Sequence, residues 1–276
     1  MTAVNLKKIL NDANKNNYAV AGLVVLGWDD ALAFTKAADE TGIPIILQAG
    51  PSCRAHTPIP ILGKMFRYLA GQTKTNICCH VDHGYTLDEC YEGIDSGFTS
   101  VMFDGSKLNL KENINISKKI ALRAHKHNIS VEGEIGFVGY DNGKISEGTN
   151  IEDAVIFANK SNIDAMAISV GNTHLQTSKK ASIDFNKINL IEAKTKIPLV
   201  LHGSSGSPVE QRKKLARKTK VAKLNIGTEI RMTFGEALRK NLKNNPKTYD
   251  RLQLLKPTIK DLTKVTKKII KQIGPN

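Results

Sequence analysis

Charged and amide side chains stand at the ends of six successive apolar segments of this chain. The stretch HVDHG at residues 80–84 places two histidines and an aspartate within five positions. The complete set is Asp82, His83, Asp104, Glu134, His174, His202 and Asn225. Burial of an uncompensated charge costs several kcal/mol, so three histidines and three carboxylates gathered at one place need a compensating partner. A bound cation would be such a partner.

The three imidazoles of His83, His174 and His202 suit a catalytic zinc ion, or another divalent transition metal, with one coordination position left open. Glu134 and Asp104 are then either further ligands or groups that orient the ligands. Each residue taken alone also has a structural interpretation. His202 could be a core histidine bonded to a carbonyl, and Asp104 could cap the turn DGS. The joint pattern favours the metal site.

The other histidines have simpler interpretations. His125 and His127 lie among lysines in the stretch RAHKHN, which predicts a solvated helix face, and His56 lies in a Pro-rich loop. His80 stays undecided: it is two residues before Asp82, which is consistent either with a role in the site or with a side chain that simply lines the barrel interior.

Two Gly-rich and Ser-rich stretches, HGSSGS (202–207) and NIGTE (225–229), follow the last two apolar segments. They supply small residues, hydroxyls and backbone amides directly before predicted helices, a pattern that favours a phosphate site. The candidate binding residues are Gly203, Ser204, Ser205, Asn225, Ile226, Gly227 and Thr228. Either stretch alone could equally be a tight turn. A metal beside a phosphate pocket indicates Lewis-acid chemistry on a phosphorylated small molecule.

Eight short apolar segments must position these residues, and helical segments alternate with them. The segments are 19–26, 44–49, 76–82, 100–105, 130–135, 165–170, 198–203 and 221–227. Their near-continuous apolar character is typical of parallel strands covered by helices. We therefore predict an α/β fold, a single (β/α)8 TIM barrel occupying residues 1–276. An open doubly wound sheet is less favoured because no GxGxxG turn follows the first segment.

The stretch after Pro257 carries Leu262, Val265, Ile269 and Ile273 at helical spacing, with lysines between them. This pattern predicts an additional amphipathic C-terminal helix packed on the barrel.

Composition limits the function classes. The 276 residues are 41% hydrophobic, which is enough for a large core, and the 40 Lys and Arg against 26 Asp and Glu give a net charge of +14. The basic residues are spread over most predicted helices without interleaved aromatics, so a solvated surface is favoured over a nucleic-acid interface. We expect no nucleic-acid partner.

The four cysteines, Cys53, Cys78, Cys79 and Cys90, form no CxxC pair, so neither a disulfide framework nor a Cys-rich zinc site is indicated. The polar N-terminal stretch does not resemble a signal peptide, and the apolar stretch 18–28 is far shorter than a membrane span. The expectation is a cytoplasmic protein that does not interact with membranes.

Six motifs in this order resemble the class II, zinc-dependent fructose-bisphosphate and tagatose-bisphosphate aldolases over nearly the whole chain. They are HVDHG, SVMFDGS, VEGEIG, GNTH, LVLHGSSG and KLNIGTE. The resemblance implies a metal-dependent lyase of carbohydrate metabolism, such as glycolysis. Such an enzyme reversibly cleaves a ketose bisphosphate to dihydroxyacetone phosphate and an aldehyde, with the metal polarising the C2 carbonyl.

Roles for individual residues follow from the resemblance. His83, His174 and His202 match the zinc ligands, and Asp82 matches the acid/base that exchanges a proton with the C4 hydroxyl. Asp104 and Glu134 match carboxylates at a second or alternative metal position. The loops Gly203–Ser205 and Asn225–Thr228 match those around dihydroxyacetone phosphate. The resemblance also implies a possible monovalent cation and a homodimer or homotetramer.

Several positions depart from the family pattern. Leu175 follows His174 where the family has glycine, and Val24 stands where it has asparagine. In the family, an acid on the loop after Glu134 abstracts the C3 proton. In this chain the position of that acid falls near Asn142, with Asp141 and Glu147 as substitutes.

The identity of the sugar and the presence of aldolase activity are therefore both open. Trp28, Arg54 and His56 could form the aldehyde end of the pocket, and the sugar could carry one phosphate rather than two. The alternative to an active aldolase is a barrel of the same family that binds metal and phosphate without that activity, or with an altered one.

Overall fold

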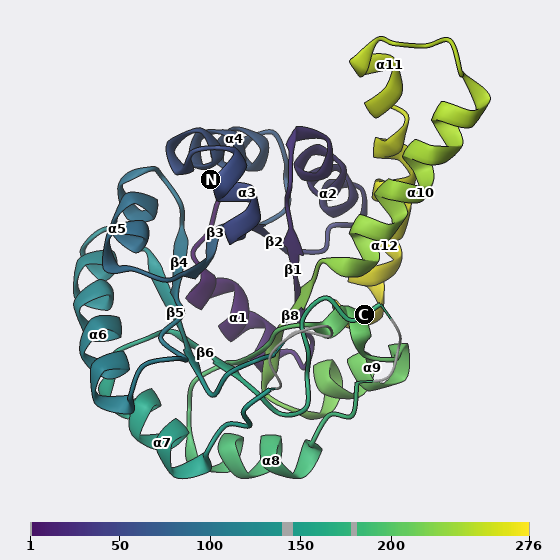
Figure 1. Cartoon of the computed structure of the whole chain (residues 1–276). Coiled ribbons are helices and arrows are strands. Elements are labelled where there is room, and N and C mark those ends of the chain that lie inside the picture. The colour runs from purple at the N-terminus through teal and green to yellow at the C-terminus, as the bar shows by residue number, and fades with distance from the viewer. Residues whose placement is uncertain (1, 140–145, 178–180, 276) are drawn as a thin grey trace.

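Eight parallel strands form a closed barrel, and each strand pairs with its neighbours in chain order (Figure 1). The computed structural model describes residues 2–139, 146–177 and 181–275. The strands are β1 Val20–Val24, β2 Ile45–Ala49, β3 Ile77–Gly84, β4 Ser100–Phe103, β5 Ser130–Ile135, β6 Ala165–Ile168, β7 Leu199–Leu201 and β8 Val221–Ile226. The (β/α)8 prediction is confirmed, and every predicted segment overlaps one strand, although β3 runs two residues past its predicted end, to Gly84.

Helices surround the barrel and alternate with the strands (Figure 1). Those between the strands are α2 Trp28–Thr41, α3 Pro51–His56, α4 Ile59–Gly71, α5 Leu87–Asp95, α6 Leu110–Lys126, α7 Ile151–Lys160, α8 Phe185–Lys194, the 3₁₀ helix η1 Ser204–Gly206 and α9 Val209–Lys218. At the two chain ends lie α1 Leu6–Lys15, α10 Thr228–Asn244, α11 Arg251–Leu255 and α12 Thr258–Ile273. Side-chain caps begin several of them, as where Thr86 and Glu89 form a capping box at α5.

The barrel interior changes character along its axis. At the amino ends of the strands it is apolar, where Val20, Ile46 and Val200 pack against Leu6 and Leu10 of α1. Helix α1 therefore closes this end of the barrel, a role that the sequence analysis did not predict. Toward the carboxyl ends of the strands the interior side chains are polar and ionisable, as expected for the catalytic face of this fold.

The predicted C-terminal helix is α12, and it packs against α2 with Leu262, Ile269 and Ile273 fully buried. Helices α10 and α11 extend away from the barrel (Figure 1). Leu242, near the end of α10, is 42% exposed for this reason although it continues the helical apolar pattern.

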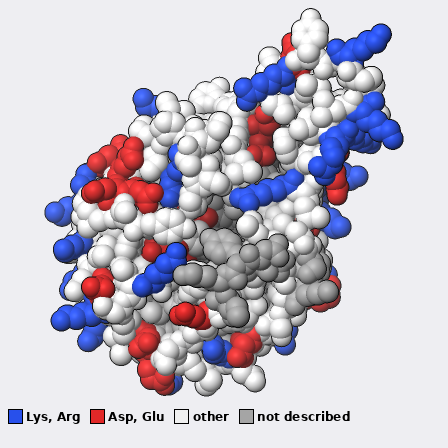
Figure 2. All heavy atoms as spheres, in the orientation of Figure 1, with Lys and Arg blue, Asp and Glu red and all other residues white. Residues whose placement is uncertain are grey.

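Basic and acidic groups are interspersed on the face shown in Figure 2, as on an ordinary solvated surface. All four cysteines are buried and free. Within the described part of the chain, no helix has the length and apolar character that crossing a bilayer requires.

Candidate metal centre and active site

A bulge in β3 brings two adjacent residues to the same site. Neighbouring residues of a regular strand point to opposite faces, so Asp82 and His83 should not both face the barrel interior. The pairing of β3 with β4 shifts register between Val81 and Gly84, and His83 has a φ of 50°. A left-handed backbone is uncommon for a residue other than glycine, and here it turns the imidazole toward the mouth of the barrel.

The guanidinium of Arg54 holds this bulge in place. It donates to the carbonyl oxygens of Ala49 (2.7 Å), Asp82 and His83 (2.9 Å), and its side chain is only 5% exposed. Arg54 was expected to stand at the aldehyde end of the pocket. Instead its two terminal nitrogens donate to the backbone, and Nη2 also lies 3.6 Å from Glu89 Oε1, so Arg54 shapes the site from behind.

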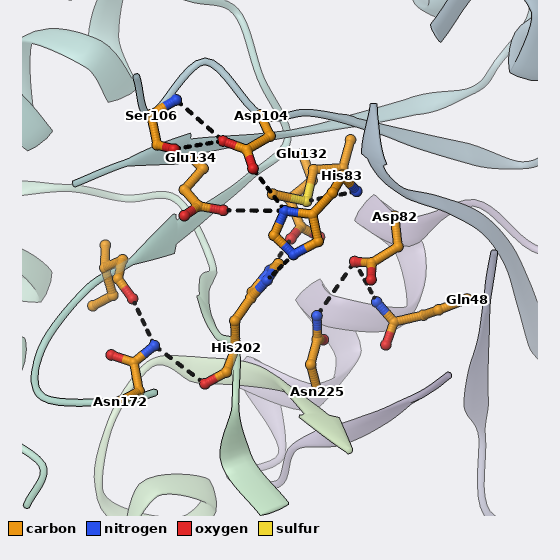
Figure 3. A network of polar contacts seen from close by, with 12 residues as sticks. Gln48, Asp82, His83, Asp104, Ser106, Glu132, Glu134, Asn172, His202 and Asn225 are labelled. Carbon is orange, nitrogen blue, oxygen red and sulfur yellow. Dashed lines mark hydrogen bonds and ion pairs between the residues drawn. The ribbon is translucent and has the colours of Figure 1, made fainter. Parts of the chain in front are cut away.

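The structure brings the three predicted histidines together, although they come from β3 and from the ends of β6 and β7 (Figure 3 shows His83 and His202). The ring centroid of His83 lies 4.5 Å from that of His202 and 5.2 Å from that of His174. One nitrogen from each ring lies within 4.8 Å of the others. Imidazoles converging in this way are what a three-histidine metal site requires.

Asp104 and Glu134 lie on the other side of His83. Asp104 Oδ2 is 2.8 Å from His83 Nδ1, and Ser106 donates to its other oxygen (Figure 3). Glu134 Oε2 is 3.7 Å from the same nitrogen. These three residues form a second group whose ligand atoms lie within 4.8 Å of one another. The arrangement matches both expectations, a group that orients His83 or a second metal position.

Two features of the donor set fit a cation. His83 Nε2 and His202 Nδ1 are 2.8 Å apart, while the opposite ring nitrogens face Asp104 and Glu132. Two lone pairs facing at this distance repel unless a proton or a metal ion lies between them. In addition, Glu134 Oε2 is buried and has no hydrogen-bond donor among the described residues. A metal ion would satisfy the two facing nitrogens, and a cation at the second group, beside His83 Nδ1, would satisfy Glu134 Oε2.

The charges of the cluster shift the pKa values of its members. Burial lowers the pKa of His83, but Asp82, Asp104 and Glu134 outweigh this and raise it to about 9. Burial and the nearby His83 hold the pKa of His174 and of His202 well below the ordinary value. His174 and His202 are thus neutral near pH 7, the state in which imidazole binds metals.

Asp82 is 5% exposed and held by two amides. Gln48 Nε2 donates to its Oδ1 at 2.7 Å, and Asn225 Nδ2 lies 3.4 Å from the same oxygen (Figure 3). Oδ2 has no donor among the described residues and is available to a substrate. Burial raises the pKa of Asp82, but His83 and His202 outweigh burial and leave the pKa below its ordinary value. The ionised form therefore dominates at neutral pH.

The loops after β7 and β8 meet beside the histidines. Ser205 Oγ accepts hydrogen bonds from the backbone amides of Gly227 (3.2 Å) and Glu229 (3.4 Å), which joins the two loops. Gly203, with a φ of 64°, makes the turn that leads from His202 into η1. Helix α10 begins at Thr228, so the positive end of its dipole points toward this corner of the site.

A pocket of about 310 Å³ opens over these groups. Its lining includes Asp82, His83, His174, Gly203, Ser205, Asn225, Gly227, Thr228 and Arg231. Two predicted phosphate residues do not line it: Ser204 donates its hydroxyl to the carbonyl of Leu201, and Ile226 is buried in the core outside the barrel. Val24 and Arg231 also line a second pocket, together with Trp28 and His56.

Sequence reasoning missed the polar layer below the candidate metal ligands, which contains Gln48, Glu132 and Lys223, and left His80 undecided. All four side chains are fully buried inside the barrel. Alternation was the available signal, because Glu132 is two residues before Glu134 and Lys223 two before Asn225. Outside the site, His125 lies on a helix as predicted, but its Nε2 is 2.8 Å from the buried Asp164.

The structure shows the backbone conformation or the exposure of two residues at which the chain departs from the family pattern. Leu175 has a φ of 56°, so it occupies a conformation that favours glycine. Of the three positions considered for the acid that abstracts the C3 proton, Asp141 and Asn142 lie outside the described residues. Glu147 is exposed, and its backbone pairs with Phe137.

Comparison with known proteins identifies the family. The sequence profile described as "Fructose-bisphosphate aldolase class-II" matches residues 4–276. The chain belongs to the class II fructose-bisphosphate aldolase family. The aldolase is therefore a lyase of a family that is generally metal-dependent and acts on phosphorylated sugars.

The aldolase is similar to relatives with different names. It is 33% identical to "6-phospho-5-dehydro-2-deoxy-D-gluconate aldolase" of Shouchella clausii, over 99% of this chain and 95% of that protein. It is 32% identical to "Fructose-bisphosphate aldolase" of Staphylococcus aureus, over 99% and 98%. Among solved structures, the YdjI aldolase from Escherichia coli K12 superposes with a TM-score of 0.87 at 25% identity, over 99% of this chain and 98% of that one.

Proposed function

We propose that this protein is a metal-dependent aldolase that reversibly cleaves a phosphorylated ketose to dihydroxyacetone phosphate and an aldehyde. The observation that carries the proposal is the convergence of His83, His174 and His202 beside the pocket that Asp82, His83 and His174 line. A Lewis acid next to an ionised carboxylate is the combination that carbon–carbon cleavage next to a carbonyl needs.

His83, His174 and His202 are the proposed ligands of the catalytic metal, with Asp104 and Glu134 as orienting groups or as a second position. We propose Zn²⁺ as the ion, since three imidazoles with an open position are typical of catalytic zinc, and other divalent transition metals accept the same donors. A monovalent cation near the phosphate is a further proposal. The bound metal would polarise a substrate carbonyl and stabilise the negative charge that develops beside it.

Asp82 is the proposed acid/base. In the cleavage direction its carboxylate accepts the proton of the C4 hydroxyl as the C3–C4 bond breaks, and in the condensation direction it returns that proton. Gln48 and Asn225 hold Oδ1, so that Oδ2 keeps a fixed direction toward the pocket. Proton transfer needs such fixed geometry within hydrogen-bond distance of the substrate oxygen.

The corner formed by Gly203, Ser205, Gly227 and Thr228 is the proposed site for the phosphate of dihydroxyacetone phosphate. Backbone amides and the start of α10 supply positive electrostatic potential there, and Arg231 adds a formal charge to the same pocket.

The identity of the aldehyde half is a separate question, because relatives of nearly equal identity carry names with different sugars. Beyond Arg231 the pocket continues into the space lined by Val24, Trp28 and His56. Val24 presents an apolar side chain where the family pattern has an amide, so contacts to substrate differ at this position.

We further propose that the enzyme works in the cytoplasm, where its four free thiols would remain reduced, and assembles as a homodimer or homotetramer. Size-exclusion chromatography with light scattering would test the assembly.

The test of function is a panel assay. Purified protein is incubated with fructose and tagatose bisphosphates and with several ketose monophosphates, and release of triose phosphate is followed before and after removal of the metal by a chelator. We expect cleavage of at least one substrate, loss of it without metal, and recovery with zinc. Turnover that persists after the metal is demonstrably gone would contradict the mechanism.

A second measurement separates an enzyme from a mere binding protein. An active enzyme exchanges the C3 proton of dihydroxyacetone phosphate with solvent, whereas a barrel that only binds metal and phosphate does so no faster than the background rate.

A further inference from the structure

A chain of buried polar groups runs beneath the proposed metal site. His202 Nε2 is 3.1 Å from Glu132 Oε1, and Lys223 Nζ donates to Glu132 Oε2 at 2.6 Å. Lys223 Nζ also lies 3.2 Å from His80 Nε2, and His80 Nδ1 lies 2.9 Å from Ser100 Oγ. The side chains of His80, Glu132, His202 and Lys223 have no exposed surface. None of these residues lines the pocket, and His202 connects them to His83, which does.

We propose that Glu132 and Lys223 are positioning residues that hold His202 in the tautomer whose Nδ1 can bind the metal. The inference rests on the proposed metal site and adds two residues to it. Neither residue lines the pocket, so both would act through His202 rather than on the substrate.

Glu132 fixes the tautomer through hydrogen-bond polarity. An ionised carboxylate has no proton to donate, so the hydrogen bond with His202 requires the proton to be on Nε2. The lone pair of neutral His202 is then on Nδ1, which faces His83 Nε2 at 2.8 Å. Metal-binding histidines generally donate their second ring N–H to such an acceptor.

Lys223 supports Glu132 from the other side. A carboxylate with no exposed surface is strongly disfavoured unless an opposite charge lies next to it. The ammonium group at 2.6 Å compensates the charge from the opposite oxygen. His80 completes the arrangement as a neutral ring, because burial and Lys223 hold the pKa of His80 well below its ordinary value.

The orientation of each group agrees with its strand. Glu132 lies two residues before Glu134 on β5, and His80 two before Asp82 on β3, so each pair faces the barrel interior. Lys223 and Asn225 are related in the same way on β8. Each of these strands thus supplies one residue to the proposed active site and one to the layer that supports it.

Two double variants test the role without leaving a buried charge unpaired. In E132L/K223M, apolar side chains of similar size replace both partners, a change that is often tolerated in protein interiors. In E132Q/K223M the amide oxygen still accepts from His202 Nε2, so this variant serves as the rescue. Zinc affinity is measured by competition with a chelator, and folding by circular dichroism and thermal melting.

We expect the zinc dissociation constant to rise about 10- to 100-fold in E132L/K223M, the range typical for loss of such a support, and to return toward the wild-type value in E132Q/K223M. The matched control is D164N. It replaces a carboxylate that faces an imidazole, His125, outside the proposed site, and it should leave zinc affinity unchanged. A folded E132L/K223M protein with wild-type zinc affinity would overturn the proposal.

A direct observation covers the case in which the double variant does not fold. Nitrogen NMR of ¹⁵N-histidine-labelled, zinc-loaded wild-type protein reports which nitrogen of His202 is protonated. The proposal requires Nε2–H with metal on Nδ1, and the opposite assignment contradicts it. If wild-type protein binds no zinc at all, the proposed function fails, whereas zinc binding that is insensitive to the double substitution refutes only the role of Glu132 and Lys223.

Discussion

At the scale of single residues, the important side chains of the site each have one atom that is bound to the protein and one that faces the site. His83 is oriented by Asp104 on one nitrogen and faces the proposed metal position with the other. Asp82 is oriented by Gln48 and faces the pocket with its second oxygen. In both side chains, a hydrogen bond from one polar atom to the protein fixes the direction of the other polar atom. Such hydrogen bonds keep the geometry of a preorganised site.

The carboxylate of Asp82 gives the first prediction. Asp82→Asn preserves shape but removes the base, so we expect kcat to fall about 10²- to 10⁴-fold while bound zinc is retained. Steady-state kinetics and metal analysis of the same preparation check this. Asp88→Asn, an exposed change in the first turn of α5, is the control and should retain wild-type kcat. A D82N enzyme within tenfold of wild type would refute the role.

Metal uptake gives the second prediction. Without metal, His83 has a pKa raised to about 9, so it is protonated at pH 7 and must lose its proton to become a ligand. Zinc binding should therefore release a proton below pH 9, and apparent affinity should increase with pH by about tenfold per unit for that one proton. Calorimetry of the metal-free protein in buffers of different ionisation enthalpy measures the proton. Uptake without proton release at pH 7 would contradict this account.

At the scale of elements, the bulge of β3 and the guanidinium of Arg54 form one unit. The bulge supplies two reactive residues from adjacent positions, at the cost of a left-handed backbone at His83. Arg54 reaches over from α3 and binds the carbonyls on both sides of that irregularity. A strained conformation persists only where its surroundings hold it, and Arg54 is the residue that does so here.

Removal of that guanidinium is the third prediction. Arg54→Met leaves buried carbonyls without donors, at about 1–3 kcal/mol each, and should raise the zinc dissociation constant at least about tenfold. Chemical denaturation and chelator competition measure the two effects. The control, Arg123→Met, removes an exposed ion pair with Asp95 and should cost about 1 kcal/mol or less. Unchanged zinc affinity in a folded Arg54→Met protein would show that the bulge holds its shape unaided.

Several parts of this arrangement could be predicted from sequence, for identifiable reasons. Continuous apolar runs mark parallel strands, so the eight strands and the residues that follow them were found. The bulge could not be predicted, since HVDHG gives no local sign that His83 adopts a positive φ. Glu132 and Lys223 were missed because each sits inside an apolar strand, where only the alternation of faces reveals a shared interior.

At the scale of the whole molecule, stability and chemistry occupy opposite ends of the barrel. Helix α1 packs on the apolar amino ends of the strands, and the ionisable groups gather at the carboxyl ends. Leu6, Ile9, Leu10 and Ala13 show the spacing of an amphipathic helix, yet nothing in the sequence indicates which surface they cover. Their place depends on the closed barrel, which is a property of the complete fold.

This separation gives the fourth prediction. Leu10→Ala removes a fully buried side chain beneath the barrel, so the free energy of unfolding should fall by about 2–5 kcal/mol while kcat of the folded enzyme is unchanged. Urea denaturation and initial-rate kinetics check the two parts. Leu252→Ala, at a position 74% exposed, is the control and should lie within about 0.5 kcal/mol of wild type. A loss of kcat at full folding would show that α1 is coupled to the site.

The four buried thiols allow local unfolding of the native protein to be measured by thiol labelling. Burial raises the pKa of Cys53 to about 11 and that of Cys78 and Cys90 to about 12, so little reactive thiolate forms in the closed structure. Cys78 and Cys79 lie on β3, and each is four positions before one of the reactive residues, Asp82 and His83 respectively. Labelling kinetics with a thiol reagent would therefore time the release of the strand that carries the reactive pair, without any engineered probe.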